Sequence, residues 1–253
     1  MSNPIFYAAD MSAAVFTSNV AADASFPLTN LFTNLPSVPW KSSSSAGNQY
    51  LKIDLGIAKP CDFISFGALN FANMTQVILY YDLYDDPGFA NGVNAASLTG
   101  GSNVTKVFTF TKVTKRYWTL MFVNCNGLIP QCGLLLLGAQ LAMPYNYNMD
   151  AELGNKLFVT TAKEALEGTI RTSRQIAGRK RMEVTFTLID DATVTAFQTM
   201  MDAIQGQFTP FFFKDHLDVV HIVHFEDDYV PATGKRANVN DLIRLKMRHQ
   251  TTG

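Results

Sequence analysis

The stretch YLKIDLG, residues 50–56, alternates between apolar and charged side chains. Every second residue from Leu51 to Leu55 is apolar, whereas Lys52 and Asp54 lie between them. In an extended strand these two sets point to opposite faces. The closing glycine is typical of a strand boundary. The pattern therefore predicts a strand with one face in a core and the other in solvent.

The rest of the first half repeats this kind of segment. Further strands are predicted at 61–71, 76–84, 106–113, 116–124 and 133–143. A Gly-, Asn- and Asp-rich stretch at 85–103 predicts a long loop. Short strands separated by turn signals are typical of a sandwich. We therefore predict a jelly-roll-like β-sandwich over residues 1–145, ending where Pro, Asn and Gly interrupt the pattern.

The second half, residues 146–253, places one helix among strands. Strands are predicted at 178–190, 216–227 and 241–249, with a turn-rich connection at 231–240. Asp190 and Asp191 occupy N-cap positions for a helix over about 191–205, which carries one apolar stripe. The fold class is therefore mainly β, with a second β-sandwich and one flanking α-helix.

The phenylalanines Phe211, Phe212 and Phe213 follow that helix. In a strand, Phe211 and Phe213 point to one face and Phe212 to the other. A strand with two apolar faces is buried on both sides. The sequence leaves open whether the helix, a second sheet, the first domain or another chain covers it.

Composition bounds the function. The chain has 253 residues, of which 47% are hydrophobic and 16% charged, against about 25% charged in typical soluble domains. Few surface charges indicate either cover by other subunits or a β-rich protein with many neutral polar residues.

A net charge of −1 argues against nucleic acid as the main partner. Three cysteines without a CxxC pair support neither a disulfide framework nor a zinc site.

Targeting signals are not evident. The N-terminal residues lack the basic and apolar regions of a signal peptide. No apolar run approaches the ~18 residues that a membrane span requires. We therefore expect no membrane insertion.

Four features follow one another within residues 26–71: Asn30-Leu31, Trp40, the strand Tyr50–Gly56 and the apolar strand Ile64–Leu69. In this order they resemble the galactose-binding-like, or discoidin-like, β-sandwich family. The resemblance implies this fold over roughly residues 20–143. Asn34-Leu35 stands where many members carry an acidic pair near a calcium site, so no metal is expected.

Residues 179–215 contain a basic alternating strand, then a helix, then an aromatic strand. This order resembles the tube or hub domain of tail proteins from long-tailed bacteriophages. The resemblance implies a distal or minor tail protein that forms a ring, as a hexamer, connecting the tail tube to the adsorption apparatus. Tail tube and hub or fibre proteins would be its partners. The expected location is the virion tail, after assembly in the host cytoplasm.

A basic cluster is the first candidate for subunit contact. It has no acidic residue between its members, which are Arg171, Arg174, Arg179, Lys180 and Arg181. A solvated strand edge and contact with DNA, at most transient, remain alternatives. Phe211, Phe212 and Phe213 are the second candidate for subunit contact.

Glycan contact is the alternative function, in which the first domain works as a lectin-like carbohydrate-binding module on host-surface glycans. Aromatic, amide and carboxylate side chains near two loops are the candidates: Trp40, Asn48, Tyr84, Asp85, Asp86, Phe89 and Asn91. Structural or inter-subunit packing is the competing interpretation of these residues, because fold alone does not confer sugar binding.

Catalytic motifs are not recognised. The sequence has no GxSxG, HExxH, P-loop or GxGxxG pattern. His216, His221 and His224 lie near carboxylates, but strand alternation directs only two or three of these groups together. We therefore expect no catalytic residues, no metal and no cofactor, and the protein is not expected to be an enzyme.

Overall fold

The computed structural model describes most of the chain. Outside the described part lie residues 1, 33–37, 68, 71–73, 75, 85–90, 99–104, 126, 148–151, 158–159, 165–169, 175–178, 187–188, 206–208, 227–234, 237–238, 241–242 and 250–253. The described part is mainly β, as predicted, with one α-helix and one 3-10 helix.

The chain forms two compact units. The first contains Met1–Ala142, Phe211–Ile222 and Thr252–Gly253, and the second contains Met143–Pro210 and Val223–Thr251. The first change of unit along the chain lies between Ala142 and Met143, and residues 211–222 return to the first unit; the division into domains at 145/146 stays a prediction. The phenylalanine strand groups with the first half of the sequence, which periodicity along the second half could not indicate.

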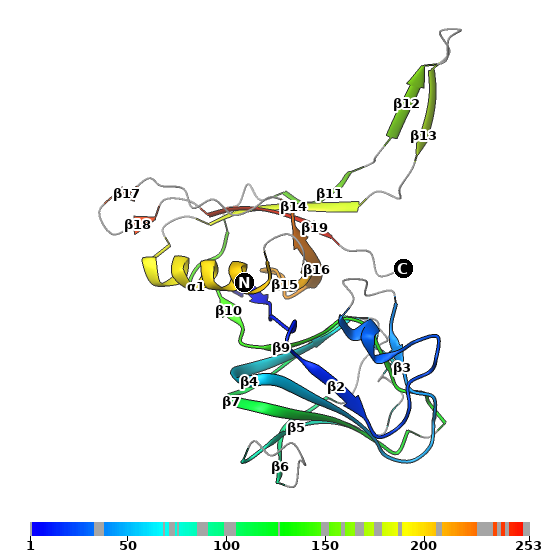
Figure 1. Cartoon of the computed structure of the whole chain (residues 1–253). Coiled ribbons are helices and arrows are strands. Elements are labelled where there is room, and N and C mark those ends of the chain that lie inside the picture. Colours follow the sequence, from blue (N-terminus) through cyan, green and yellow to red (C-terminus); the bar gives the residue numbers. More distant parts are fainter. Residues whose placement is uncertain are drawn as a thin grey trace. The chain divides into compact units, whose positions relative to one another are not determined.

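An antiparallel sheet is the main feature of the first unit (Figure 1). Its strand order is β2–β4–β7–β5–β6, and β9 also pairs with β4. The strands are β2 (Val15–Ser18), β4 (Gln49–Phe66), β5 (Gln76–Asp82), β6 (Gly92–Ser97), β7 (Lys106–Val123) and β9 (Leu135–Gly138). The short strands β3 (Trp40–Lys41) and β8 (Gln131–Cys132) pair with each other, and Leu28–Phe32 forms the 3-10 helix η1.

Two long strands replace four predicted ones. The segments 50–56 and 61–71 merge into β4, and 106–113 and 116–124 merge into β7. Gly56, at φ 79°, lies where the β4–β7 register shifts between Asp54 and Lys59. A bulge of this kind bends a strand without ending it. The strand β6 also forms inside the predicted loop 85–103.

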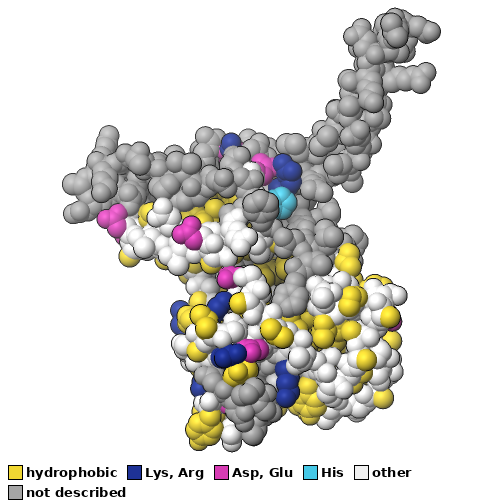
Figure 2. Space-filling model, viewed as in Figure 1, with side chains coloured by type: hydrophobic (Ala, Val, Ile, Leu, Met, Phe, Trp, Pro, Cys, Tyr) yellow, Lys and Arg dark blue, Asp and Glu magenta, His cyan; other side chains and the backbone are white. Residues whose placement is uncertain are grey.

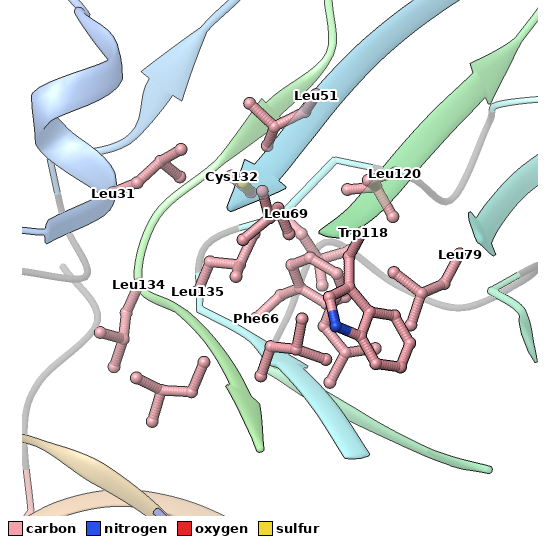
Figure 3. Packing of buried hydrophobic residues seen from close by; sticks show 14 of the residues in the cluster. Leu31, Leu51, Phe66, Leu69, Leu79, Trp118, Leu120, Cys132, Leu134 and Leu135 are labelled. Carbon is pink, nitrogen blue, oxygen red and sulfur yellow. The ribbon is translucent and has the colours of Figure 1, made fainter. Parts of the chain in front are cut away.

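The apolar face of the sheet builds the core of the first unit. Figure 3 shows Leu51, Phe66, Leu79, Trp118 and Leu120 meeting from different strands. All five are buried. Burying one such large side chain contributes about 1.5–3 kcal/mol to the free energy of folding. The alternating apolar residues of β4 and β7 therefore determine which face of the sheet is buried.

A second strand group in the first unit joins distant parts of the sequence. β1 (Ile5–Tyr7) pairs with β10 (Leu141–Ala142) on one side and with β15 (Phe211–Lys214) on the other. The three phenylalanines of β15 are completely buried. The Phe6 ring lies 6.0 Å from that of Phe211 and 5.1 Å from that of Phe213. Phe212 joins the core cluster instead, so both faces of β15 are covered, as predicted.

An antiparallel sheet and one helix form the second unit. The strands β11 (Glu152–Leu157), β14 (Arg179–Phe186), β19 (Ile243–His249) and the end of β16 (Val220–Phe225) pair in that order. The predicted helix is α1 (Asp191–Ala203). The carboxylate of Asp190 caps it by accepting the Thr193 N–H at 2.6 Å. Phe197 of α1 contacts Phe225 of β16 edge to face.

Two ribbons in the second unit pair only with themselves among the described strands. β12 (Thr160–Glu164) pairs with β13 (Ile170–Arg174), and β17 (Lys235–Arg236) pairs with β18 (Val239–Asn240). The second ribbon lies in the connection that the sequence predicted as turn-rich.

Candidate functional site

A groove of about 200 Å³ lies on the face of the main sheet opposite the core. Val15 and Thr17 of β2 form one side, Lys52 and Asp54 of β4 line the middle, and Tyr117 of β7 forms the other side. Core residues Ile53 and Trp118 complete the lining. The groove thus spans three neighbouring strands.

Strand register explains why these side chains meet. Val15 is paired with Asp54, and Asp54 is paired with Tyr117. Thr17 is paired with Lys52. Directly opposed residues of antiparallel strands share a face, with Cβ atoms about 5 Å apart. The groove is therefore a direct product of the β2–β4–β7 register.

An ion pair fixes the polar end of the groove. Arg116 donates to both carboxylate oxygens of Asp54, from Nε at 2.7 Å and from Nη2 at 2.9 Å. The Gly56 N–H also donates to Asp54, at 2.8 Å. The hydrogen bond from Arg116 lowers the pKa of the Asp54 carboxyl more than partial burial raises it. The carboxylate is therefore ionised at neutral pH.

The same arginine lies against the aromatic wall. The Arg116 guanidinium carbon lies 4.8 Å from the centre of the Tyr117 ring, within the range of a cation–π contact. Tyr117, Arg116 and Asp54 thus form one cluster in which each group orients the next.

The groove combines three kinds of contact in a small space. Tyr117 and Val15 offer apolar surface, Asp54 offers acceptor oxygens, and Lys52 and Thr17 offer donors. A small polar ring with an apolar face matches this size and chemistry.

The predicted glycan-contact residues do not form this site. Trp40 is 1% exposed and packs near Phe122, with ring centres 6.1 Å apart. It belongs to the core, so its assignment as a contact was wrong. Asp85, Asp86 and Phe89 lie outside the described residues.

The remaining glycan candidates lie far apart. Asn48 is exposed, and its side chain accepts the Asn124 N–H, just after the end of β7. Tyr84 is 73% exposed and follows Leu83, whose carbonyl accepts a hydrogen bond from Lys115 of β7. Asn124 and Lys115 thus mark the positions of Asn48 and Tyr84 along β7. The nine-residue separation of these two markers corresponds to roughly 30 Å at about 3.3 Å per residue. Asn91 lies at the Tyr84 end, because both backbone N–H groups donate to the Asp82 carboxylate.

The candidates for subunit contact divide into two groups. Phe211, Phe212 and Phe213 are buried inside the chain, so they are not available for such a contact and that prediction was wrong. The structure places Arg171 and Arg174 on β13, and Arg179, Lys180 and Arg181 on β14, and describes only the backbone of all five. Contact between subunits through them stays a prediction.

Two of the histidines near carboxylates, His221 and His224, each lie beside a polar partner. His221 Nε2 lies 2.9 Å from Asp215 Oδ2, and His224 is the register partner of Arg248. Within the described residues, no group of three or more His, Cys, Asp or Glu could hold a metal ion. No helix in the described part is long and apolar enough to cross a membrane.

Sequence reasoning missed the groove for a clear reason. The alternation in YLKIDLG placed Lys52 and Asp54 on the exposed face. It could not show that β2 and β7 flank them, because strand order and register are set by the whole sheet. The adjacent Arg116 and Tyr117, in the strand predicted at 116–124, were the available signal.

The sequence matches no protein-family model and no curated protein. Solved structures are similar over about half of this chain. Chitosan-binding module 1 of a chitosanase/glucanase from Paenibacillus sp. IK-5 has 15% identity and a TM-score of 0.45, over 52% of this chain and 98% of that one. Module 2 of the same enzyme, in complex with chitotriose, has 12% identity and a TM-score of 0.45, over 50% and 97%.

A family 32 carbohydrate-binding module from C. perfringens NanJ, in complex with galactose, is also similar. Its identity is 18% and its TM-score 0.43, over 52% of this chain and 98% of that one.

Proposed function

We propose that the first unit is a non-enzymatic module that binds a sugar in the groove between β2 and β7. The Tyr117–Arg116–Asp54 cluster carries this proposal, because it holds an aromatic ring beside an ionised carboxylate. Sugars offer an apolar face of C–H groups and a rim of hydroxyl groups. Ligand sites commonly combine apolar lining with a few fixed polar groups in this way.

Each lining residue has a role in this proposal. Tyr117 would pack against the C–H face, and the Asp54 oxygens would accept from ring hydroxyl groups. Lys52 of β4 and its register partner Thr17 of β2 would donate hydrogen bonds to hydroxyl oxygens of the sugar. Arg116 would act through Asp54 and Tyr117 by holding both in place.

The test is a titration of the full chain with galactose and with chitotriose, followed by NMR and calorimetry. Tyr117→Ala and Asp54→Asn should each weaken binding about tenfold, near the ~1.4 kcal/mol that this factor represents. Tyr84→Ala is the control, because Tyr84 is exposed and outside the groove. Equal binding by all variants, or none by the wild type, would refute the proposal.

A second candidate function is a structural role in a virion, as part of the ring that connects a bacteriophage tail tube to the adsorption apparatus. Two observations support it. The strand–helix–strand order expected for residues 179–215 is present as β14, α1 and β15. The β12–β13 ribbon also pairs only with itself among the described strands, and such ribbons are marginal in isolation.

This second candidate has its own test. Light scattering on the purified chain should show a closed oligomer, a hexamer by the resemblance, and mass spectrometry should detect the chain in purified virions. A chain that stays monomeric at high concentration and is missing from virions would exclude this role.

A further inference from the structure

We propose that the sugar ligand is a neutral oligosaccharide, which extends from the groove across β7 and β5 to β6. The inference deepens the proposed sugar-binding function and rests on it. The groove would bind one end of the sugar chain, and the strands beyond the groove would bind the rest. Two observations carry the proposal. A row of polar side chains crosses the whole sheet, and a buried hydroxyl group in this row has no partner among the described residues.

The polar row follows from strand register. Thr17 of β2 is paired with Lys52 of β4, and Lys52 is paired with Thr119 of β7. Thr119 is also paired with Tyr80 of β5, and Tyr80 is paired with Asn94 of β6. Directly paired residues of antiparallel strands share a face of the sheet. These five side chains therefore form one line on the face that carries the groove, because Thr17 and Lys52 already line it.

The length of the polar row matches a sugar chain better than a single sugar. The row crosses five neighbouring strands, β2, β4, β7, β5 and β6 (Figure 1). One strand separation is ~4.8 Å, so the row is about 19 Å long. A sugar ring is about as long as one strand separation. The groove reaches only from β2 to β7, and a chain of about four units would also cover β5 and β6.

The far part of the row offers the same kinds of contact as the groove. Tyr80 is partly exposed and lies diagonally from Tyr117, because its register partner Thr119 is two residues further along β7. Diagonal neighbours on a sheet lie about 7–8 Å apart, so the two tyrosines provide successive aromatic surfaces for sugar rings. Asn94 is exposed at the far end of the row, and its amide can both donate to and accept from hydroxyl groups.

The charges on this face favour a neutral ligand. Lys52 is the one charged residue among the five members of the row, and the neighbouring Asp54 carboxylate is paired with Arg116. In the view of Figure 2, neutral polar and hydrophobic atoms cover most of the described part of the first unit, and charged side chains are few. A sugar chain with a charge on every unit would meet little opposite charge here. Neutral sugar units fit this surface.

Thr119 is the member of the row that points to a ligand. The residue is 3% exposed, and its Oγ1 has no hydrogen-bond partner among the described residues. It shares the groove face with Tyr117, since the intervening Trp118 belongs to the core. A buried hydroxyl group without a partner destabilises the folded protein. A sugar hydroxyl group that enters between Lys52 and Tyr80 would supply the missing partner.

The experiment measures affinity against the length of the sugar chain, by calorimetry on the full protein. The ligands are galacto-oligosaccharides and N-acetylated chito-oligosaccharides of one to about four units. In at least one series, affinity should rise about tenfold or more from one unit to the longest chain. Tyr80→Ala and Asn94→Ala should each weaken binding of the longest chain about three- to tenfold, and change binding of the single sugar less than about twofold.

Thr119→Val separates ligand binding from a structural role. Valine has nearly the same shape but no hydroxyl group, so binding of the longest chain should weaken about three- to tenfold. The free energy of unfolding, measured by urea titration, should stay the same or rise, because no hydrogen bond within the protein is lost. A hydroxyl group that served only the fold would give the opposite pair of results.

Ser97→Ala is the matched control for Asn94→Ala. Both residues are exposed on β6, but Ser97 is paired with Ile78 and lies outside the polar row. Its replacement should leave the affinity for every chain length unchanged. If Tyr80→Ala does not fold, Thr119→Val and Asn94→Ala still decide the question, because neither removes an apolar side chain.

Three outcomes would overturn the inference. Equal affinity for one unit and for the longest chain would leave the groove as a site for a single sugar. A gain with chain length that survives Tyr80→Ala, Asn94→Ala and Thr119→Val would place the rest of the sugar chain elsewhere. A wild type that binds no sugar of either series would remove both this inference and the proposed sugar-binding function.

Discussion

The phenylalanine strand β15 and the ribbon β12–β13 both come from the second half of the sequence, yet they are held in opposite ways. β15 pairs with β1 from the other end of the chain, and its three phenylalanines are fully buried. The ribbon pairs with no third strand among those described. The strand β15 takes its stability from distant residues of the same chain, whereas the described residues provide the ribbon with no strand beyond its own two.

The difference follows from composition. FFFK has apolar side chains for both faces, so burial by any apolar surface is favourable. TTAKE and IRTSR offer almost none. Hydrophobic content therefore predicts whether a strand is buried, and it does not predict which segment lies beside it.

The largest effect should come from breaking the buried strand. Phe213→Ala removes a fully buried ring that contacts Phe6. We expect a loss of about 3–5 kcal/mol in the free energy of unfolding, measured by urea titration. Leu217→Ala is the control, because that side chain is 63% exposed and should change stability by less than about 0.5 kcal/mol. A loss below about 1 kcal/mol for Phe213→Ala would contradict the burial of β15.

A smaller effect is expected where the segment after β1 crosses β9. A Cβ at Gly138 would lie 2.8 Å from the Cβ of Ala9, closer than packed carbon atoms approach. Gly138→Ala should therefore cost about 1–3 kcal/mol through overpacking. Adding Ala9→Gly should recover part of that cost. No cost for Gly138→Ala would show that this segment is loosely held.

The turn after β15 gives a pH prediction. Burial raises the pKa of Asp215, but hydrogen bonds from His221, Val219 and Leu217 outweigh it and lower the pKa overall. A carboxyl with a lowered pKa in the folded state stabilises the fold above its unfolded pKa, near 4, and loses that contribution as the pH falls through the folded value.

Acid unfolding should test this directly. The wild type should lose stability below about pH 4, and Asp215→Asn should be less stable at pH 7 by about 1–3 kcal/mol, with a flatter acid dependence. The measurement is the free energy of unfolding at several pH values. An identical pH dependence in both chains would show that Asp215 does not contribute.

The smallest effect is expected for the ribbon. Replacing residues 158–176 by a short Gly-Ser linker should change stability by less than about 0.5 kcal/mol, because a two-stranded ribbon adds little alone. The same variant should lose self-association if Arg171 and Arg174 of β13 contact another subunit, as the second candidate function expects. A large loss of stability would show that the ribbon supports the monomer, and the contrast with β15 would then disappear.

The sequence predicted where helices and strands lie better than it predicted which strands pair. The helix at 191–205, the strand at 178–190 and the burial of Phe211–Phe213 followed from local periodicity, and the structure agrees. The pairing of β15 with β1 did not, since pairing depends on residues about 200 positions apart. The groove could not be predicted for the same reason, because its lining residues come from three strands that are not consecutive in the sequence.

The pairing of β1 with β15 also affects the order of events during synthesis. The ribosome produces Phe6 roughly 200 residues before its partner Phe213. At translation rates of about 5–20 residues per second, that strand waits on the order of ten seconds or more for its neighbour. During this interval its edge and its apolar side chains lack the strand that covers them in the finished protein. Chaperone binding or misassembly at β1 is therefore possible until residue 214 has left the ribosome and β15 can pair with β1.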